Sequence, residues 1–167
     1  MIIAIVIALF SLAFIGFGYS LFNGAESPKN TAKELQSEGL TGTVTGARVK
    51  IWNDTTGENR ASEMELTFSG ADGSSHTLTT THFPAVSTTL TQKAGWYEDF
   101  SSKSEVLNQQ VRYSLGEKPI VELESELPKL ASAPWSFPNF LGIAFAGIGL
   151  IGLISAVIGF FRSLSAG

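Results

Sequence analysis

The stretch PNFLGIAFAGIGLIGLISAVIGFF, residues 138–161, decides the fold class of this protein because it contains no charged residue. A helix of this length measures about 36 Å at 1.5 Å per residue, whereas the hydrocarbon core of a bilayer is about 30 Å thick. Ser136 is placed to cap such a helix, Pro138 is tolerated in its first turn, and Arg162 follows its last apolar residue. The pattern predicts a membrane-spanning helix over residues 138–161.

A second apolar stretch begins the chain. Residues 2–22 contain no charged side chain and are long enough to cross a bilayer. A cleaved signal peptide is the alternative interpretation, but such peptides have a basic start, a shorter apolar core and a small-residue cleavage site. The sequence FNGA at residues 22–25 fits that site poorly. We therefore expect residues 1–22 to form an uncleaved first transmembrane helix.

Charge distinguishes the middle of the chain from its ends. The protein has 167 residues and a formal net charge of −4, and residues 23–137 hold ten of its eleven Lys and Arg and all fifteen Asp and Glu. Because nucleic-acid binding needs a basic surface, this acidic segment argues against a nucleic-acid partner. The chain has no Cys, which excludes disulfides and thiolate metal sites.

The side of the membrane on which this segment lies is predicted from its length and composition. Lys29, Lys33 and Lys129 flank the spans on the loop side, against Arg162 beyond the second span. A simple positive-inside count would place the loop in the cytoplasm, but segments much longer than about 60 residues are translocated largely regardless of charge. Because the loop is acidic and rich in Ser and Thr, we expect a two-pass plasma-membrane protein with the loop outside and both termini in the cytoplasm.

These features divide the chain into six predicted segments. A capping-box pattern from Thr31 to Glu34 and a stop signal at Gly39 predict a short helix at residues 32–38. The segments are a first transmembrane helix (1–22), a juxtamembrane linker with this short helix (23–39), an extracytoplasmic β-rich domain (40–130), an interfacial linker (131–137), a second transmembrane helix (138–161) and a cytoplasmic tail (162–167).

Alternation of apolar and polar residues predicts β-strands in the middle domain. Residues 64–68, 111–115 and 121–124 each follow this period, which places one face of a strand on a core and the other in water. We expect about five short antiparallel strands that form a small sandwich or open barrel. The fold class is then an α+β membrane protein in which two transmembrane helices flank this β-domain.

Turn residues separate the predicted strands. Asp72-Gly73 is a strong hairpin signal because both residues tolerate positive φ, and residues 116–119 predict a second hairpin. Residues 54–59, which contain Gly57, predict a further turn. The stretch 84–108 is the least regular and is expected to hold a helical turn and a loop.

No motif predicts an active site or a metal centre. His76 and His82 are the only histidines, and on one strand they would lie about 20 Å apart, too far to share a zinc ion. Structural or exposed histidines are therefore expected. Glu122, Glu124 and Glu126 recur at every second position, which indicates a solvent-exposed strand edge more than an acid–base pair. We expect no catalytic, cofactor-binding or metal-binding residues.

Two features are candidate partner-binding surfaces. Residues 95–100 contain Trp96, Tyr97 and Phe100, which either fill the core of the β-domain or anchor a partner. The apolar stretch at residues 138–161 carries small residues at steps of three and four, which let helices approach closely. This stripe either packs against the first span or docks onto the helices of a larger complex, and it consists of Gly142, Ala146, Gly149, Gly152, Ala156 and Gly159.

The segments MELTFSGADGSSHTLTT (residues 64–80) and QQVRYSLGEKPIVELE (residues 109–124), set between two apolar stretches, resemble a bacterial family of two-span membrane proteins catalogued as domain of unknown function 3592. Aligned on Tyr113, the chain keeps Val111 of the family's hairpin. It departs from that hairpin where the family has a glycine, a valine and a proline, which here are Val106, Gln109 and Leu115. The family brings no established activity, so the resemblance implies no catalytic residues.

The overall layout is also similar to that of small accessory subunits of actinobacterial respiratory supercomplexes. Spans without ionisable side chains lack the groups that proton relays and ion coupling need. We therefore predict a non-enzymatic accessory or assembly subunit that stabilises or positions a multi-subunit membrane complex, with a cytochrome bc–oxidase supercomplex as the first expectation. Its expected partners are other membrane-protein subunits and lipid, without a cofactor. The alternative is an envelope module that binds or senses a ligand through the β-domain.

Overall fold

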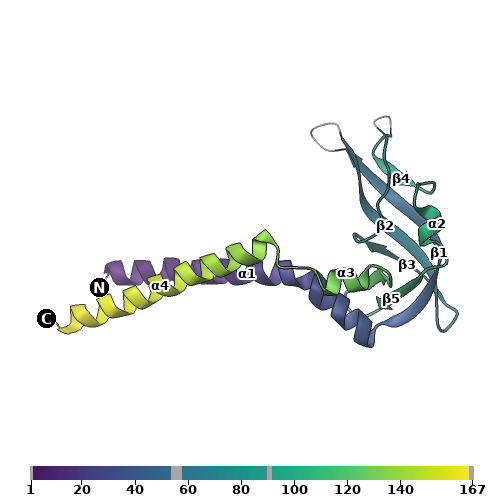
Figure 1. The fold of residues 1–167 in the computed structure, drawn as a ribbon. Helices are drawn as coiled ribbons and strands as arrows, with labels where there is room; N and C mark the ends of the chain where they lie inside the picture. The colour runs from purple at the N-terminus through teal and green to yellow at the C-terminus, as the bar shows by residue number, and fades with distance from the viewer. Residues whose placement is uncertain (1, 54–57, 90–91, 166–167) are drawn as a thin grey trace. The chain divides into compact units, whose positions relative to one another are not determined.

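The computed structural model describes residues 2–53, 58–89 and 92–165, and its elements are shown in Figure 1. The protein is an α+β chain with a six-stranded antiparallel sheet and a long apolar helix near each terminus. Two compact units are present. The helix-pair unit comprises Met1–Pro28 and Ala133–Gly167, and the β-domain comprises Lys29–Ser132.

The first long helix, α1 (Ile2–Glu38), has 37 residues and continues well beyond the predicted first span. The predicted separate helix at residues 32–38 is wrong in its start, because residues 23–31 are helical too and Thr31 caps nothing. Pro28 lies inside α1, where it removes one backbone donor without ending the helix. The predicted end is confirmed, since Glu38 is the last helical residue and the N–H of Gly39 donates to Leu35 O at 3.0 Å.

The second long helix, α4 (Phe137–Ser165), covers the predicted second span and extends past Arg162. Its start is closed by Asn139, whose Oδ1 accepts hydrogen bonds from the backbone N–H of Ser136 at 2.7 Å and from the hydroxyl of Ser136 at 2.8 Å. Ser136 is thus the donor in this cap. Both α1 and α4 are long and apolar enough to cross a membrane.

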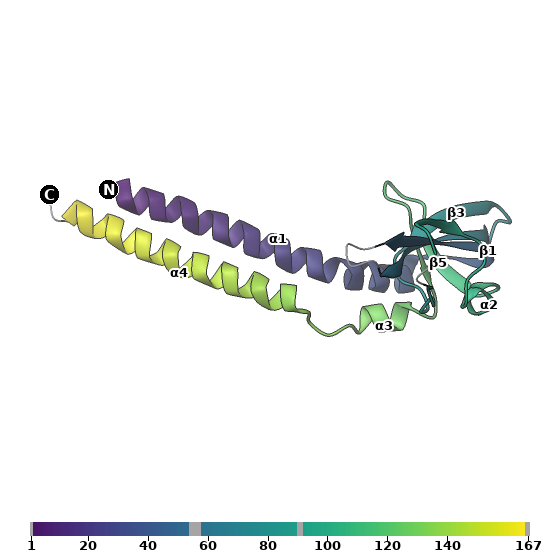
Figure 2. The same ribbon diagram turned by 90° about the horizontal axis from the view of Figure 1, so that it is seen from above.

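Within the helix-pair unit, α4 runs alongside the N-terminal part of α1, as two views show (Figures 1 and 2). Glycines make this approach possible. A Cβ on Gly18 would lie 2.5 Å from Gly142 O, and a Cβ on Gly149 would lie 2.6 Å from Ser11 O. Phe145 packs between Phe14 and Phe17 with ring centroids 5.6 Å and 5.2 Å apart. Close backbone contact of this kind is the usual basis of helix association in lipid.

The β-domain is built on one antiparallel sheet with the strand order β3-β2-β1-β5-β6, and β4 pairs separately with β1. Strand β1 is the longest, with 14 residues, and lies at the centre of the sheet. The strands are β1 (Leu40–Asn53), β2 (Asn59–Gly70), β3 (Ser75–Thr80), β4 (Gly95–Tyr97), β5 (Gln110–Ser114) and β6 (Ile120–Leu123), and two short helices are α2 (Lys103–Val106) and α3 (Leu127–Ala131).

Most predicted strands and both predicted hairpins are confirmed. Gly73 takes the positive φ of 79° that the β2–β3 turn requires, and residues 115–119 connect β5 to β6. The additional strand is β4, which lies inside the irregular stretch 84–108 and was missed because only three residues pair with β1. Of the predicted turn at residues 54–59, positions 54–57 lie outside the described residues.

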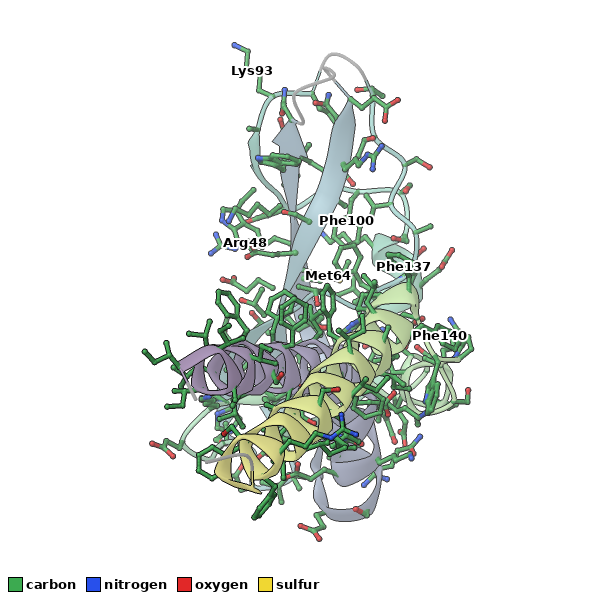
Figure 3. The ribbon with its side chains drawn as sticks, turned by 90° about the vertical axis from the view of Figure 1, so that its left-hand side faces the viewer. Arg48, Met64, Lys93, Phe100, Phe137 and Phe140 are labelled. Atoms are coloured by element: carbon green, nitrogen blue, oxygen red, sulfur yellow. The ribbon has the colours of Figure 1, made fainter. Side chains whose placement is uncertain are left out.

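The core of the β-domain fills the inner face of this sheet. Met64 is part of this core and Phe100 packs against it, whereas Arg48 and Lys93 project outward in Figure 3. A second small cluster joins the end of α1 to α3 through Ala32, Leu35 and Leu127. The buried residues of the main core are Val44, Met64, Leu66, Phe68, Val106, Val111, Tyr113, Val121 and Leu123.

Candidate functional site

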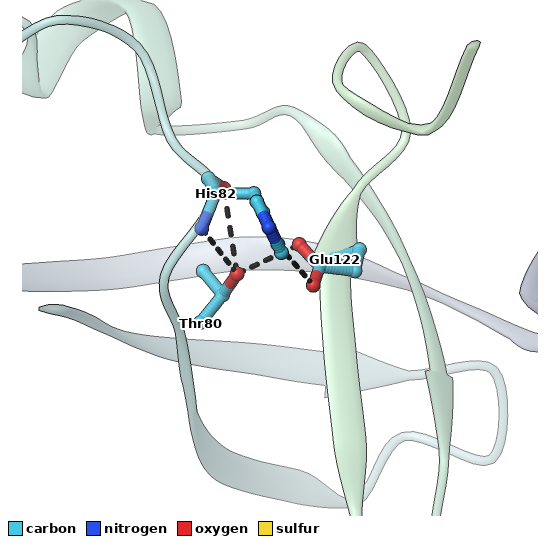
Figure 4. A network of polar contacts seen from close by, with 3 residues as sticks. All are labelled: Thr80, His82 and Glu122. Atoms are coloured by element: carbon cyan, nitrogen blue, oxygen red, sulfur yellow. Dashed lines mark hydrogen bonds and ion pairs between the residues drawn. The ribbon is translucent and has the colours of Figure 1, made fainter. Parts of the chain in front are cut away.

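A buried polar cluster joins β3 to β6. The carboxylate of Glu122, a residue only 7% exposed, accepts a 2.7 Å hydrogen bond from the hydroxyl of Thr80 and lies 2.9 Å from Nδ1 of His82 (Figure 4). The backbone N–H of His82 donates to the same hydroxyl at 3.0 Å. The predicted solvent-exposed edge is therefore wrong for Glu122, because β3 approaches β6 and covers this side chain.

The geometry of this cluster is that of a structural link. In a nucleophile–base–acid relay, the imidazole lies between the hydroxyl and the carboxylate. Here Thr80 and His82 each contact Glu122 directly, so the hydroxyl is hydrogen-bonded to the acid and not to the ring. The cluster therefore connects β3 to β6, which are far apart in the chain. The hydroxyl of Thr80 is not activated as a nucleophile by the imidazole of His82.

The other two glutamates of the predicted edge have different surroundings. Glu124 remains half-exposed and forms an ion pair with Arg112 at 3.3 Å, as a residue on a strand edge would. Glu126 precedes α3, outside the strand, and contacts Lys129 at 2.8 Å. The alternation of residues 121–124 thus does not continue to Glu126, because β6 ends at Leu123.

His76 belongs to a second polar group at the β2–β3 turn. The hydroxyl of Ser74 donates to Asp72 Oδ1 at 2.5 Å and lies 2.6 Å from Nε2 of His76. The hydroxyl and the backbone N–H of Ser74 hold the pKa of Asp72 below its ordinary value. The imidazole lies 5.5 Å from the ring centroids of both Phe68 and Tyr113. Both histidines therefore make contacts within the β-domain.

The three aromatic residues of the candidate segment separate into two roles. Phe100 packs against the main core, so this part of the segment follows the core interpretation. Tyr97 exchanges hydrogen bonds with the backbone of Lys93, at 3.1 Å from its N–H and 2.8 Å to its carbonyl. Trp96 is 38% exposed, which leaves it as the member of the segment that a partner can reach.

Two cations lie over the exposed Trp96 ring. The guanidinium carbon of Arg48 is 5.0 Å from the ring centroid and Nζ of Lys50 is 5.7 Å from it. Arg48 is also fixed by two hydrogen bonds to Glu65, at 2.7 Å and 3.0 Å. This hydrogen-bonding, together with the charges of Glu65 and Glu98, raises the pKa of Arg48 above its ordinary value.

A cavity of about 460 Å³ opens beside this group, and we name it the β1 slot. It is lined by residues 45–48 of β1, by Glu65 and Thr67 of β2, and by Glu98, Lys103 and Leu107. No local sequence pattern predicts the slot, because its walls come from four separate parts of the chain. Among the described residues, no three His, Asp or Glu side chains lie together as a metal site would need.

The small-residue stripe of α4 faces α1 over most of its length. A Cβ on Gly142 would lie 2.7 Å from Gly18 O, and one on Gly152 would collide with the hydroxyl of Ser11. Ala146 backbone atoms meet Gly18, and Ala156 is buried. Gly159 has no neighbouring atom within 4 Å of a Cβ position. From Gly142 to Ala156 the stripe therefore follows the interpretation in which the two long helices pack on each other.

Comparisons with family models, with curated proteins and with solved structures find no match for this chain.

Proposed function

We propose that the protein crosses a membrane twice through α1 and α4 and acts as a non-enzymatic accessory or assembly subunit of a multi-subunit membrane complex. The proposal is supported by the apolar surface of the helix-pair unit. Residues 2–22 and 137–161 contain no charged side chain, and large apolar residues such as Phe10, Ile151 and Ile154 are exposed. A surface of this kind requires lipid or other membrane helices around it.

The observation that carries the proposal is that some α4 glycines contact α1 and others do not. Gly142, Gly149 and Gly152 meet α1, whereas Gly147 and Gly159 meet nothing within 4 Å of a Cβ position. At 100° per residue, Gly147 lies about 140° around α4 from Gly142, on the side turned away from α1. Since a small residue on an outward face lets another helix approach closely, a partner subunit would pack over Gly147. The role is then to hold and position partners, without chemistry in the spans.

The proposed location is the plasma membrane, with the β-domain on the extracytoplasmic side and both termini in the cytoplasm. The acidic, Ser- and Thr-rich composition of the β-domain supports this side. The respiratory supercomplex remains the first expectation for the partner, on the similarity of layout described above. The resemblance to the family of domain of unknown function 3592 is likewise a prediction.

Native purification tests this role. The tagged full-length chain is extracted in mild detergent and the subunits that co-purify are identified by mass spectrometry. Wild type should retain a defined set of membrane subunits, and Gly147→Leu should lose them because it fills the open face. Gly149→Leu is the matched variant that instead disrupts the contact between α1 and α4. Recovery of wild type as a lone species would contradict the proposal.

A second candidate function is an envelope module that binds or senses a ligand through the β-domain. The exposed Trp96 beside the β1 slot favours it. A ligand module should respond to its ligand when purified alone, whereas an accessory subunit depends on its partners. Trp96→Phe, compared with Trp52→Phe at the end of β1, would show which exposed tryptophan reports ligand by fluorescence.

A further inference from the structure

One edge of β1 lacks a strand partner over part of its length. On that side, β5 pairs with residues 40–43 and β4 pairs with residues 49–51. Val44 exchanges hydrogen bonds with Gln109 O at 2.9 Å and with the N–H of Asn108 at 3.0 Å. In the described part of the chain, neither β4 nor β5 pairs with residues 45–48, and these four residues line the β1 slot.

Ala47 directs unpaired backbone groups into this gap. Along a strand, residues whose side chains share a face also point their N–H and C=O groups to the same side. Ala47 packs on the main core, on the inner face that Val44 also occupies. A bulge follows Val44, so the pairing with β2 gives the direction: Val44 lies opposite Phe68 and Ala47 opposite Leu66, two residues apart on β2. Since the backbone of Val44 bonds toward β5, neither pair exchanges backbone hydrogen bonds with β2, and the N–H and C=O of Ala47 point to the side where no strand is present.

Lys103 and Glu98 add two charges of opposite sign to the lining of the slot. Within the described residues, neither the ammonium of Lys103 nor the carboxylate of Glu98 forms a hydrogen bond or an ion pair, although the charge of Glu98 acts on the neighbouring Arg48. Arg48 and Glu65, in contrast, are already paired with each other. The slot thus offers one cation, one anion and the backbone hydrogen-bonding groups of a strand edge.

We propose that the β1 slot binds a short extended peptide, which pairs with Ala47 as an added piece of strand. From Val44 to Val49 the open edge measures about 16 Å, and a tripeptide in extended form measures about 10 Å. Its terminal carboxylate pairs with Lys103 and its terminal ammonium with Glu98. Strand addition to an open edge is an established mode of peptide recognition. The inference concerns the β-domain alone and is independent of the accessory role.

The test uses the full-length protein in detergent micelles with triglycine as the probe, followed by backbone-amide NMR. Saturable shifts are expected at residues 45–48, Glu98 and Lys103. The double variant Glu98→Gln with Lys103→Gln should weaken binding by about tenfold or more, because both terminal charges lose their partners. The matched control, Glu117→Gln with Lys118→Gln in the β5–β6 turn, should bind as wild type does.

A capped probe separates charge recognition from backbone pairing. N-acetyl-triglycine amide has the same backbone without terminal charges and should bind as weakly to wild type as triglycine binds to the double variant. The amide spectrum of the rest of the β-domain shows whether each variant is folded. The proposal is overturned if triglycine causes no saturable shift in the slot. Unchanged affinity in the slot double variant, or equal affinity for the capped probe, overturns it as well.

Discussion

The hydroxyl of Thr80 donates a 2.7 Å hydrogen bond to the carboxylate of Glu122, and this bond ties together the two strands at opposite ends of the sheet order. Residues 80 and 122 belong to β3 and β6, which are separated by three other strands in the hydrogen-bonded path. His82 contacts the second carboxylate oxygen from the chain that leaves β3. A sheet that would otherwise end in two separate edges is therefore joined by side chains.

Thr80→Val should destabilise the β-domain by about 1.5–3 kcal/mol. Valine keeps the volume of the side chain but removes a hydrogen bond to a buried carboxylate, which then lacks one partner. Urea unfolding of the full-length protein, followed by tryptophan fluorescence, measures the change. Thr79→Val, at the neighbouring exposed position, should stay within about 0.5 kcal/mol of wild type. Equal effects of the two variants would argue against the link between β3 and β6.

Phe68→Ala should cost about 3–5 kcal/mol of folding stability. Phe68 is fully buried on β2, and its ring centroid lies 4.8 Å from that of Tyr113, so truncation leaves a cavity at the centre of the core. Urea unfolding followed by tryptophan fluorescence measures this loss of stability as well. Leu115→Ala is the control, because Leu115 is 46% exposed and its loss should change stability by little. A small effect of Phe68→Ala would show that the core repacks around this position.

Asn139→Ala should lower the stability of the helix-pair unit by about 1–3 kcal/mol. Asn139 is 1% exposed, closes the start of α4 through Ser136, and donates a 3.0 Å hydrogen bond to the carboxylate of Glu26 on α1. Alanine removes both contacts at once. Thermal unfolding in detergent, monitored by circular dichroism, measures this loss of stability. Ser155→Ala removes a hydroxyl that bonds only within its own helix, so its unfolding curve should overlay that of wild type.

The β2–β3 turn should weaken in acid. Hydrogen bonds from the hydroxyl and the backbone N–H of Ser74 hold the pKa of Asp72 below its ordinary value of 3.8. The ionised carboxylate therefore contributes stability that is present above pH 3.8 and is lost as the pH falls through the lowered pKa of the folded state. An NMR titration of the Asp72 carboxyl carbon measures this pKa directly.

Ser74→Ala tests the cause of that shift. It removes the hydroxyl and keeps the backbone donor, so the pKa of Asp72 should rise part of the way toward 3.8. Ser75→Ala, at the first residue of β3, leaves both hydrogen bonds in place and should give the wild-type titration. An unchanged pKa in Ser74→Ala would show that the backbone N–H alone accounts for the shift.

Local patterns in the sequence were sufficient for the features that depend on neighbouring residues. The lengths of the two apolar stretches predicted two long apolar helices, and Asp72-Gly73 predicted the β2–β3 hairpin, because helix length and turn conformation depend on residues close together in the chain. The same reasoning was wrong between residues 23 and 31. A linker and a separate helix starting at residue 32 were expected there, but α1 continues through these residues with Pro28 inside it, since a proline removes a single backbone hydrogen bond.

The sequence by itself determined the class of the protein: two uncharged stretches of helical length around an acidic, alternating segment. Only the tertiary structure decided the burial of Glu122, which results from contacts with residues 40 and 42 positions away. It also decided which α4 glycines contact α1, and the opening of the β1 slot between β4 and β5. These features depend on contacts between segments that are distant in the sequence. The local alternation of apolar and polar residues does not specify which segments make those contacts.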